Sequence, residues 1–284
     1  MGKIVIILSI FALIAVSCGQ ATSKQTTNNT VAEDSTTSQI VDIKLPEDFQ
    51  TILQQLELNK DKYLKFLHQL ELNTGENYSE FMSQQDLSYS PDKSIWLIPQ
   101  MIDVDNVTSS FLLSCTILII DNKTKKIVSI SDKPYQLESS AWQLKKIWIG
   151  EGSYLLSDSV RAFCINANYE GSSRVSPASG TETFLFVQQG NSLKKIFTYK
   201  ERSEGGSFED SNCESYFSET STDLTISDKK TNGFYDIIIK TERVNRENIR
   251  IGEGENDCEE KTTNETDSQH FRFNGKEYEE DKKE

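Results

Sequence analysis

A single long apolar run stands near the start of the chain. Ile4–Val16 is interrupted only by the polar Ser9, and the basic Lys3 precedes it. A helix needs about 20 apolar residues to span a bilayer, whereas a run of roughly 7–15 after a positive charge is typical of a secretory signal. The pattern therefore predicts a signal peptide.

The end of this run, Ala15-Val16-Ser17-Cys18, resembles a bacterial lipobox. The resemblance implies a signal peptide over 1–17, cleavage before Cys18, and acylation of that cysteine, which would hold the protein to a lipid bilayer. The alternatives are an ordinary signal peptide with a chance cysteine, or an uncleaved anchor.

The residues after Cys18 bear on which membrane face the protein occupies. Gly19, rather than Asp, follows the cysteine, which in lipoproteins of this type favours the outer membrane. No acidic cluster comes directly after it, and such a cluster is the usual surface-export cue in Bacteroidota lipoproteins. We therefore expect the periplasmic face.

Polar residues fill the chain from 18 to 40, and amphipathic patterns occupy 41–92. The first segment is rich in Thr, Ser and Asn, with almost no large apolar side chains, which predicts a flexible tether. In the second, apolar residues between 49 and 56 recur at i, i+3, i+4 and i+7, and a shorter stretch follows at 63–70. We expect 41–92 to be a helical region packed on the following domain.

From residue 93 the chain changes to short runs of β-branched and apolar residues separated by turn signals. Asp121–Lys125 has the composition of a hairpin turn. We assign 93–279 to one β-rich domain, 201–221 to a polar, acidic stretch within it, and 280–284 to a charged tail. The expected strands are 95–98, 111–120, 127–130, 142–149, 160–167, 184–187, 193–199, 224–226, 234–244 and 271–273.

The number of expected strands predicts a mainly β fold with a small N-terminal helical region. The architectures that fit are an antiparallel sandwich, an open barrel or a curved sheet. We find no clean sequence repeat, which disfavours a propeller.

Several motifs of the β-rich domain resemble a group of uncharacterised secreted or periplasmic bacterial proteins. The motifs are Gly171-Ser172-Ser173-Arg174, Phe184-Leu185-Phe186 with Gly190, Asn232-Gly233-Phe234-Tyr235-Asp236, and Phe271-Arg272-Phe273-Asn274-Gly275-Lys276-Glu277-Tyr278. The resemblance implies a location outside the cytoplasm and a β-rich fold, and brings no activity with it. Cys164, directly after Phe163, departs from the group's pattern.

Composition and charge narrow the functional classes. Aromatic residues are plentiful enough for a core, with 14 Phe, 10 Tyr and 3 Trp, although the 36% hydrophobic content is low for a globular chain. A formal net charge of −14 disfavours electrostatic binding to nucleic acid. His68 and His270 are the only histidines, so we expect neither His-rich metal sites nor most His-based catalysis. No nucleotide, hydrolase or zinc motif is present, and we predict no cofactor and no metal.

The four cysteines after Cys18 are expected to meet an oxidising compartment, where pairing is the default. Cys213 and Cys258 lie in polar segments, and we favour a disulfide between them. Cys115 and Cys164 lie inside apolar runs, where they could be bridged or remain buried thiols.

Two polar segments are candidate ligand-binding sites. Backbone N–H groups of Ser172 and Ser173 together with the guanidinium of Arg174 could bind an anion; the alternative is an ordinary surface turn. The acidic groups around 103–106 and 253–260 could form a weak calcium site or solvated loops.

These observations together favour a membrane-anchored periplasmic lipoprotein acting as a non-enzymatic interaction or envelope-assembly module with an envelope protein partner. The alternatives are an envelope hydrolase that uses two carboxylates, and a small-ligand or ion-binding protein. A concave pocket lined by aromatic and polar groups would favour ligand binding.

Overall fold

The computed structural model describes residues 43–105, 110–208, 213–252 and 257–282. They belong to one compact unit, Ile40–Glu284. The expected signal peptide, Cys18 and the tether lie outside the described residues. Among the helices of the described part, none is long and apolar enough to cross a membrane.

Two α-helices precede the strands. Helix α1 spans Glu47–Gln55 and follows Pro46, while α2 spans Lys60–Thr74. Asn59 begins α2, because its side chain accepts a hydrogen bond from the Lys62 N–H at 3.0 Å. Gly75 ends it with φ +71°, a conformation that costs glycine little. A short 3₁₀ helix, η1, follows at Tyr78–Phe81.

Thirteen strands follow among the described residues. They are β1 (Ser83–Leu87), β2 (Ser90–Asp105), β3 (Ser110–Asp121), β4 (Ile127–Ser131), β5 (Tyr135–Ser139), β6 (Trp142–Leu155), β7 (Arg161–Gly171), β8 (Ala178–Gln189), β9 (Ser192–Phe208), β10 (Ser215–Thr231), β11 (Phe234–Arg250), β12 (Cys258–Phe273) and β13 (Tyr278–Glu280).

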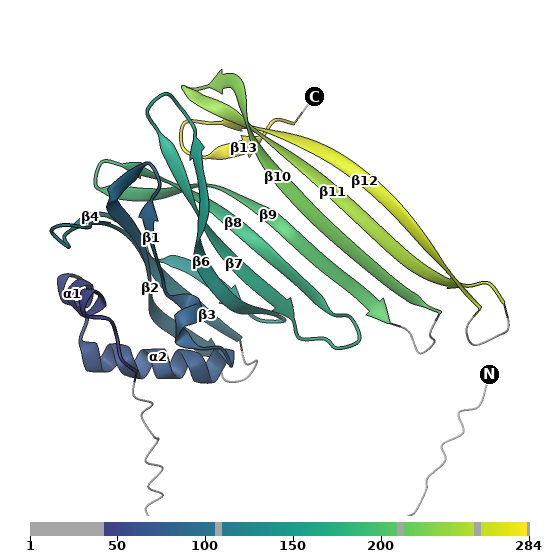
Figure 1. Ribbon diagram of the computed structural model, residues 1–284, viewed down its shortest axis with the longest axis horizontal. Helices are drawn as coiled ribbons and strands as arrows, with labels where there is room; N and C mark the ends of the chain where they lie inside the picture. Colours follow the sequence, from purple (N-terminus) through teal and green to yellow (C-terminus); the bar gives the residue numbers. More distant parts are fainter. Residues whose placement is uncertain (1–42, 106–109, 209–212, 253–256, 283–284) are drawn as a thin grey trace, which may run out of the picture. The chain divides into compact units, whose positions relative to one another are not determined.

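The strands form one large sheet that branches at β9 and does not close into a barrel. Along one path the order is β1-β2-β3-β4-β9-β10-β11-β12-β13, and β6-β7-β8 joins the other edge of β9 (Figure 1). Strand β5 pairs with β3 alone. All pairings are antiparallel except β4 with β9, which is parallel over two residue pairs.

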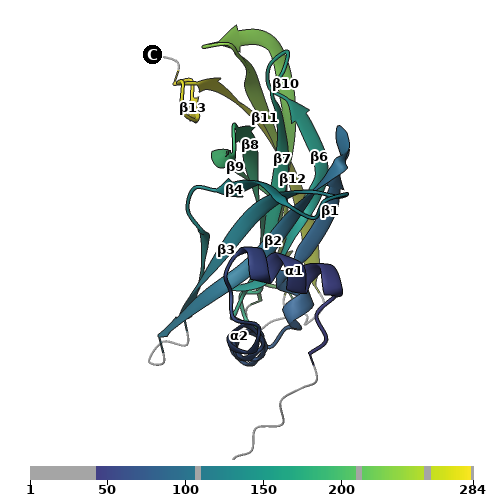
Figure 2. The same cartoon turned by 90° about the vertical axis from the view of Figure 1, so that its left-hand side faces the viewer.

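Three hydrophobic clusters lie between these layers. The first is shared by one face of β2–β3 and the facing side of β6–β8, and includes Ile117 and Phe163. The second lies between the other side of β7–β9 and β11–β13, and includes Leu185 and Phe273. The third joins the outer face of β2–β3 to the helices, through residues such as Trp96 (Figure 2).

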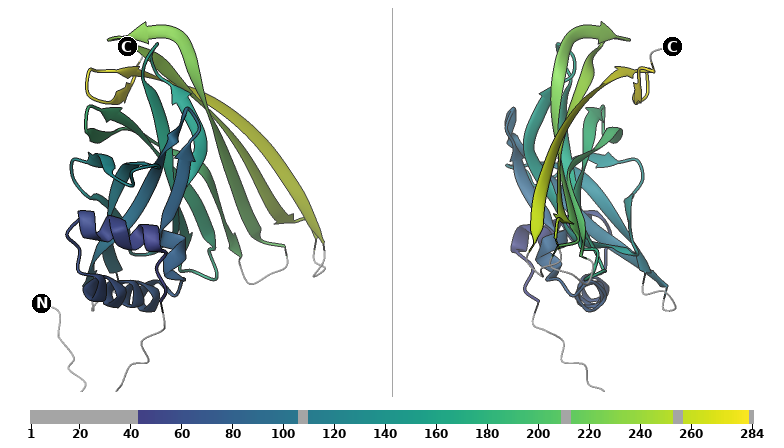
Figure 3. Two further views of the ribbon diagram at one scale, coloured as in Figure 1. Left: turned by 60° about the vertical axis from the view of Figure 1, so that its left-hand side comes forward. Right: turned by 90° about the vertical axis from the view of Figure 1, so that its right-hand side faces the viewer.

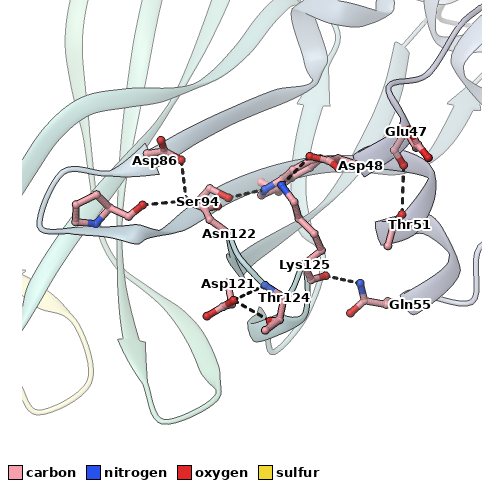
Figure 4. Close-up of polar contacts among 12 residues, drawn as sticks. Glu47, Asp48, Thr51, Gln55, Asp86, Ser94, Asp121, Asn122, Thr124 and Lys125 are labelled. Carbon is pink, nitrogen blue, oxygen red and sulfur yellow. Dashed lines mark hydrogen bonds and ion pairs between the residues drawn. The ribbon is translucent and has the colours of Figure 1, made fainter.

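Polar contacts fix α1 to the turn between β3 and β4. The Gln55 side chain donates to the Lys125 carbonyl at 2.6 Å and accepts from the Ile127 N–H at 3.2 Å. Lys125 Nζ lies 2.7 Å from Asp48 Oδ2 (Figure 4). Asp121 Oδ1 accepts two hydrogen bonds from Thr124, which lower the pKa of that exposed carboxyl.

Strands β10, β11 and β12 run together beyond the second hydrophobic cluster (Figure 3). In this distal part most side chains are polar, with exceptions such as Phe217 and Ile249, and Glu259–Ser268 of β12 is exposed throughout. The disulfide between Cys213 and Cys258 joins the start of β12 to the residues preceding β10, across 45 positions of sequence.

The structure confirms the predicted fold class, mainly β with a small helical region. Of the three architectures considered, it has the features of an open, curved sheet with packed layers. Strands begin at Ser83, earlier than the expected boundary at 93, and strand pairing includes most of the polar stretch 201–221. A disulfide was predicted and is present, in the favoured pair, while Cys115 and Cys164 are buried free thiols.

Candidate functional site

A cavity of about 420 Å³ lies between β5, the start of β6 and strands β7–β9. Strand β5 pairs with β3 alone, so its other edge has no strand partner among the described residues. A volume of several hundred Å³ is usual for small-molecule sites, which often occupy the mouths of barrel-like sheets. The lining residues are Tyr135, Gln136, Leu137, Glu138, Ser140, Trp142, Tyr169, Gly180, Thr181, Glu182, Lys200, Arg202 and Ser203.

One wall of the cavity is set by the register of β7, β8 and β9. Tyr169, Gly180 and Ser203 are direct neighbours across the three strands. Glu182 follows Gly180 by two positions in β8 and is the direct neighbour of Lys200 in β9. Residues two positions apart in a strand point to the same face, so Glu182 and Lys200 share the face on which Tyr169 lies. A Cβ atom at Gly180 would lie 3.3 Å from the Arg202 carbonyl oxygen, so a larger residue there would crowd β9.

The opposite wall comes from β5 and the start of β6. Tyr135 packs its ring on Phe184, with the ring centroids 4.9 Å apart, and on Phe186 at 5.8 Å. Both phenylalanines belong to the first hydrophobic cluster. The cavity therefore continues from the end of that cluster and has a firm aromatic base.

Trp142 forms the exposed rim of the site. Its carbonyl accepts a hydrogen bond from the Ser140 N–H at 3.0 Å, which tightens the connection between β5 and β6. Its backbone pairs with Gly171 of β7. The side chain is 46% exposed, so a large part of the indole is available for contact with a ligand.

Burial keeps the two tyrosines of the cavity protonated. It raises the pKa of both Tyr135 and Tyr169 well above the ordinary value, and the nearby charge of Glu182 raises both further. Neither hydroxyl makes a hydrogen bond to another described residue. Both therefore remain neutral donors with spare hydrogen-bonding capacity.

The charged groups of the cavity differ in whether they already form ion pairs or hydrogen bonds. Arg202 is 2.8 Å from Glu219 and 3.8 Å from Glu204, so its charge is largely compensated. Within the described part of the chain, Glu138, Glu182 and Lys200 form neither ion pairs nor side-chain hydrogen bonds. The cavity therefore offers two carboxylates and one ammonium group to a ligand.

The predicted anion-binding turn lies next to this cavity, outside its lining. Ser172, Ser173 and Arg174 are exposed in the β7–β8 connection. The Ser172 N–H donates to the Ala141 carbonyl at 3.3 Å, and the Ser173 hydroxyl accepts from the Ser176 N–H at 3.0 Å. These contacts are those of a surface turn, and anion binding there stays a prediction.

The other chemistry considered from the sequence does not converge on one place. His68 lies in α2 and His270 in β12, and neither lines the cavity. No group of three or more His, Cys, Asp or Glu within the described ranges could hold a metal ion. Residues 106 and 253–256 of the two acidic segments lie outside the described residues.

None of the thirteen lining residues was predicted as a site. Twelve come from five strands and Ser140 from the β5–β6 connection, and they meet through contacts between distant segments, which single-sequence patterns do not reveal. One local signal was available, because Gln136 and Glu138 alternate with the more buried Tyr135 and Leu137, and the large, exposed Trp142 follows. That pattern predicts a surface, and by itself does not indicate a cavity.

Comparison of the chain with protein-family models, with curated proteins and with solved structures finds no match.

Proposed function

We propose that the chain is a lipoprotein, held by acylated Cys18 at the periplasmic face of the outer membrane, whose β-rich domain binds a small ligand. The cavity between β5 and β7–β9 carries this proposal. It combines aromatic side chains with hydrogen-bonding groups that have no partner among the described residues. Of the functions considered from the sequence, this arrangement favours the ligand-binding alternative over a flat docking module.

The firmness of the walls supports binding without a large rearrangement. Tyr135 is packed on the first hydrophobic cluster, and β7, β8 and β9 pair as neighbours along the wall, with a register shift between Thr181 and Glu182. Groups held in place before binding reduce the entropy lost when a ligand is bound. An envelope protein partner remains compatible with the long polar strands β10–β12.

A carboxylate hydrolase is the second candidate, because Glu138 and Glu182 line the same cavity. Paired carboxylates perform acid and base catalysis on glycosidic bonds. Under this alternative a Glu182→Gln variant would still bind substrate and lose turnover. Under the binding proposal, a bound ligand is recovered unchanged from the wild-type protein.

A thermal-shift panel on the purified, acylated protein tests the proposal. The panel comprises neutral oligosaccharides, the organic cations choline and spermidine, and the anions citrate and galacturonate. We expect at least one class to raise the melting temperature, because a ligand that binds only the native state stabilises it. Trp142→Ala should remove the shift.

Tyr216→Ala is the matched control, since Tyr216 is a similarly exposed aromatic residue, at 43%, on the distant strand β10. It should retain the shift. If no class shifts the wild-type protein, or if both variants behave alike, the cavity is not the binding site.

A further inference from the structure

The cavity's lining indicates the kind of ligand it takes. Apart from Leu137 and Gly180, every lining residue is polar, charged or aromatic with a polar atom. A cavity for a lipid or another apolar ligand would instead be lined predominantly by hydrophobic side chains. The ligand should therefore carry many hydrogen-bonding groups.

The uncompensated charges of the cavity, two carboxylates and one ammonium group, disfavour an anionic ligand. Glu138 and Glu182 are two negative groups, and Lys200 and Arg202 are two positive groups. An anion would meet both carboxylates, and Arg202 is already paired with Glu219 at 2.8 Å. A cation would meet the Lys200 ammonium as well as the two carboxylates, whereas a neutral polyol can form hydrogen bonds with all three groups.

The aromatic groups add a second requirement. Trp142 presents a large exposed indole at the rim, and Tyr169 faces inward from β7 beside Gly180. Tyr135 is less available, since Lys195 Nζ lies 5.3 Å from its ring centroid. Flat aromatic surfaces bind the C–H faces of sugar rings, which are weakly apolar while their edges carry hydroxyl groups.

We infer that the cavity binds a neutral saccharide, an inference that rests on the proposed ligand-binding function. A sugar hydroxyl both donates and accepts hydrogen bonds. The carboxylates of Glu138 and Glu182 would accept from such hydroxyls, while Lys200 and the tyrosine hydroxyls would donate to them. The indole of Trp142 would lie against a sugar ring.

The test is a titration by isothermal calorimetry of the acylated protein with cellotriose, maltotriose and chitotriose. The detergent is an amine oxide, because glucoside and maltoside detergents carry the sugar groups in question. Choline and galacturonate are titrated in parallel as a cation and an anion. We expect at least one trisaccharide to bind and the two charged probes not to bind.

Variants assign the binding to the cavity. Trp142→Ala should weaken trisaccharide binding about tenfold through loss of the aromatic contact. Glu182→Gln keeps the size of the side chain and removes its charge, and should weaken binding about fivefold, since hydrogen bonds to charged groups are the stronger ones. Tyr216→Ala should bind as the wild type does. Circular dichroism checks that each variant is folded. If Trp142→Ala does not fold, Glu182→Gln alone tests whether the cavity is the binding site.

The outcomes separate the two proposals. If choline or galacturonate binds in a Trp142-dependent way and no trisaccharide does, the cavity is a binding site and the saccharide inference is wrong. If a trisaccharide binds equally well to both cavity variants, its site lies elsewhere and the inference is also wrong. If no probe binds, both the inference and the proposed function lose their support.

Discussion

At the residue scale, Gly150 lies at an irregularity of the β6–β7 pairing where there is no room for a side chain. The β6–β7 register shifts between Ile149 and Ser153, so three residues of β6 lie opposite Cys164 alone. This is a β-bulge, and Gly150 is buried inside it. A Cβ atom at Gly150 would collide with Cys164 Sγ and lie 3.0 Å from the Asn166 side chain.

We expect Gly150→Ala to lower the free energy of unfolding by about 1–3 kcal/mol, the usual cost of overpacking a filled core. Urea denaturation measures it. Gly171→Ala is the control, because its Cβ would come no closer than 3.4 Å to a neighbour; the effect there should stay within about 0.5 kcal/mol.

The cause is checked by a double-mutant cycle with Cys164→Ala. Removal of the Cys164 sulfur should recover most of the loss caused by Gly150→Ala. An undiminished loss in the Cys164→Ala background would mean that the sulfur is not what excludes the side chain.

At the scale of elements, the helices are joined to the sheet by both apolar and polar contacts. Phe49, Ile52 and Leu53 of α1 are buried against the outer face of β2–β3. Gln55, at the end of the helix, bridges the carbonyl of Lys125 and the N–H of Ile127. One side chain therefore satisfies two backbone groups at a strand end.

Gln55→Ala should lower the free energy of unfolding by about 1 kcal/mol, the net worth of a typical hydrogen bond. Gln54→Ala removes an exposed side chain of the same type from the same helix, without a hydrogen bond to a described residue, and should change stability by less than about 0.5 kcal/mol. Chemical denaturation of both variants makes the comparison. Equal effects would show that the bridge contributes nothing beyond helix propensity.

The elements that the sequence predicts well are those with an apolar face. The runs 111–120 and 184–187 lie within β3 and β8, and the hairpin turn at Asp121–Lys125 joins β3 to β4 as expected. By contrast, most of β10 and β12 was missed. Most of their distal side chains are polar, so no regular alternation of apolar and polar residues marks them as strands.

At the scale of the whole molecule, the pKa values of the tyrosines reflect their burial between the packed layers. Burial is the largest cause of a raised pKa at seven of the ten tyrosines. These seven are Tyr63, Tyr89, Tyr135, Tyr154, Tyr169, Tyr199 and Tyr278. They are distributed over all the packed layers.

We therefore expect stability to fall as the pH rises above about 10, the ordinary tyrosine pKa. In that range the unfolded chain has released protons that the folded chain retains, so unfolding becomes more favourable. Below it the contribution of these groups is fully present. A spectrophotometric titration should show the tyrosinate signal of these seven residues delayed until the fold is lost, as followed by circular dichroism. A simple titration of all ten near pH 10 in the folded protein would contradict this.

The fold class could be predicted from the sequence because apolar runs and turn residues are local signals. The cavity could not be predicted, because it depends on the position of β5 beside β7–β9 and on the register of those three strands. Glu138 and Glu182 are 44 positions apart in the sequence, and nothing in either neighbourhood indicates that they line one cavity. The Ser172–Arg174 turn, which did carry a local signal, lies beside it.

The branching of the sheet at β9 has a consequence for how the chain folds. Hairpins such as β2–β3, β7–β8 and β10–β11 link neighbouring segments and can form early. The β4–β9 ladder joins Ile130 to Ser192, so its loop-closure entropy must be overcome before its two residue pairs contribute. Long-range closures of this kind slow folding. This ladder joins the segment that includes β5 to strands β7–β9, and the cavity lies between them. The cavity should therefore be among the last features of the molecule to form during folding.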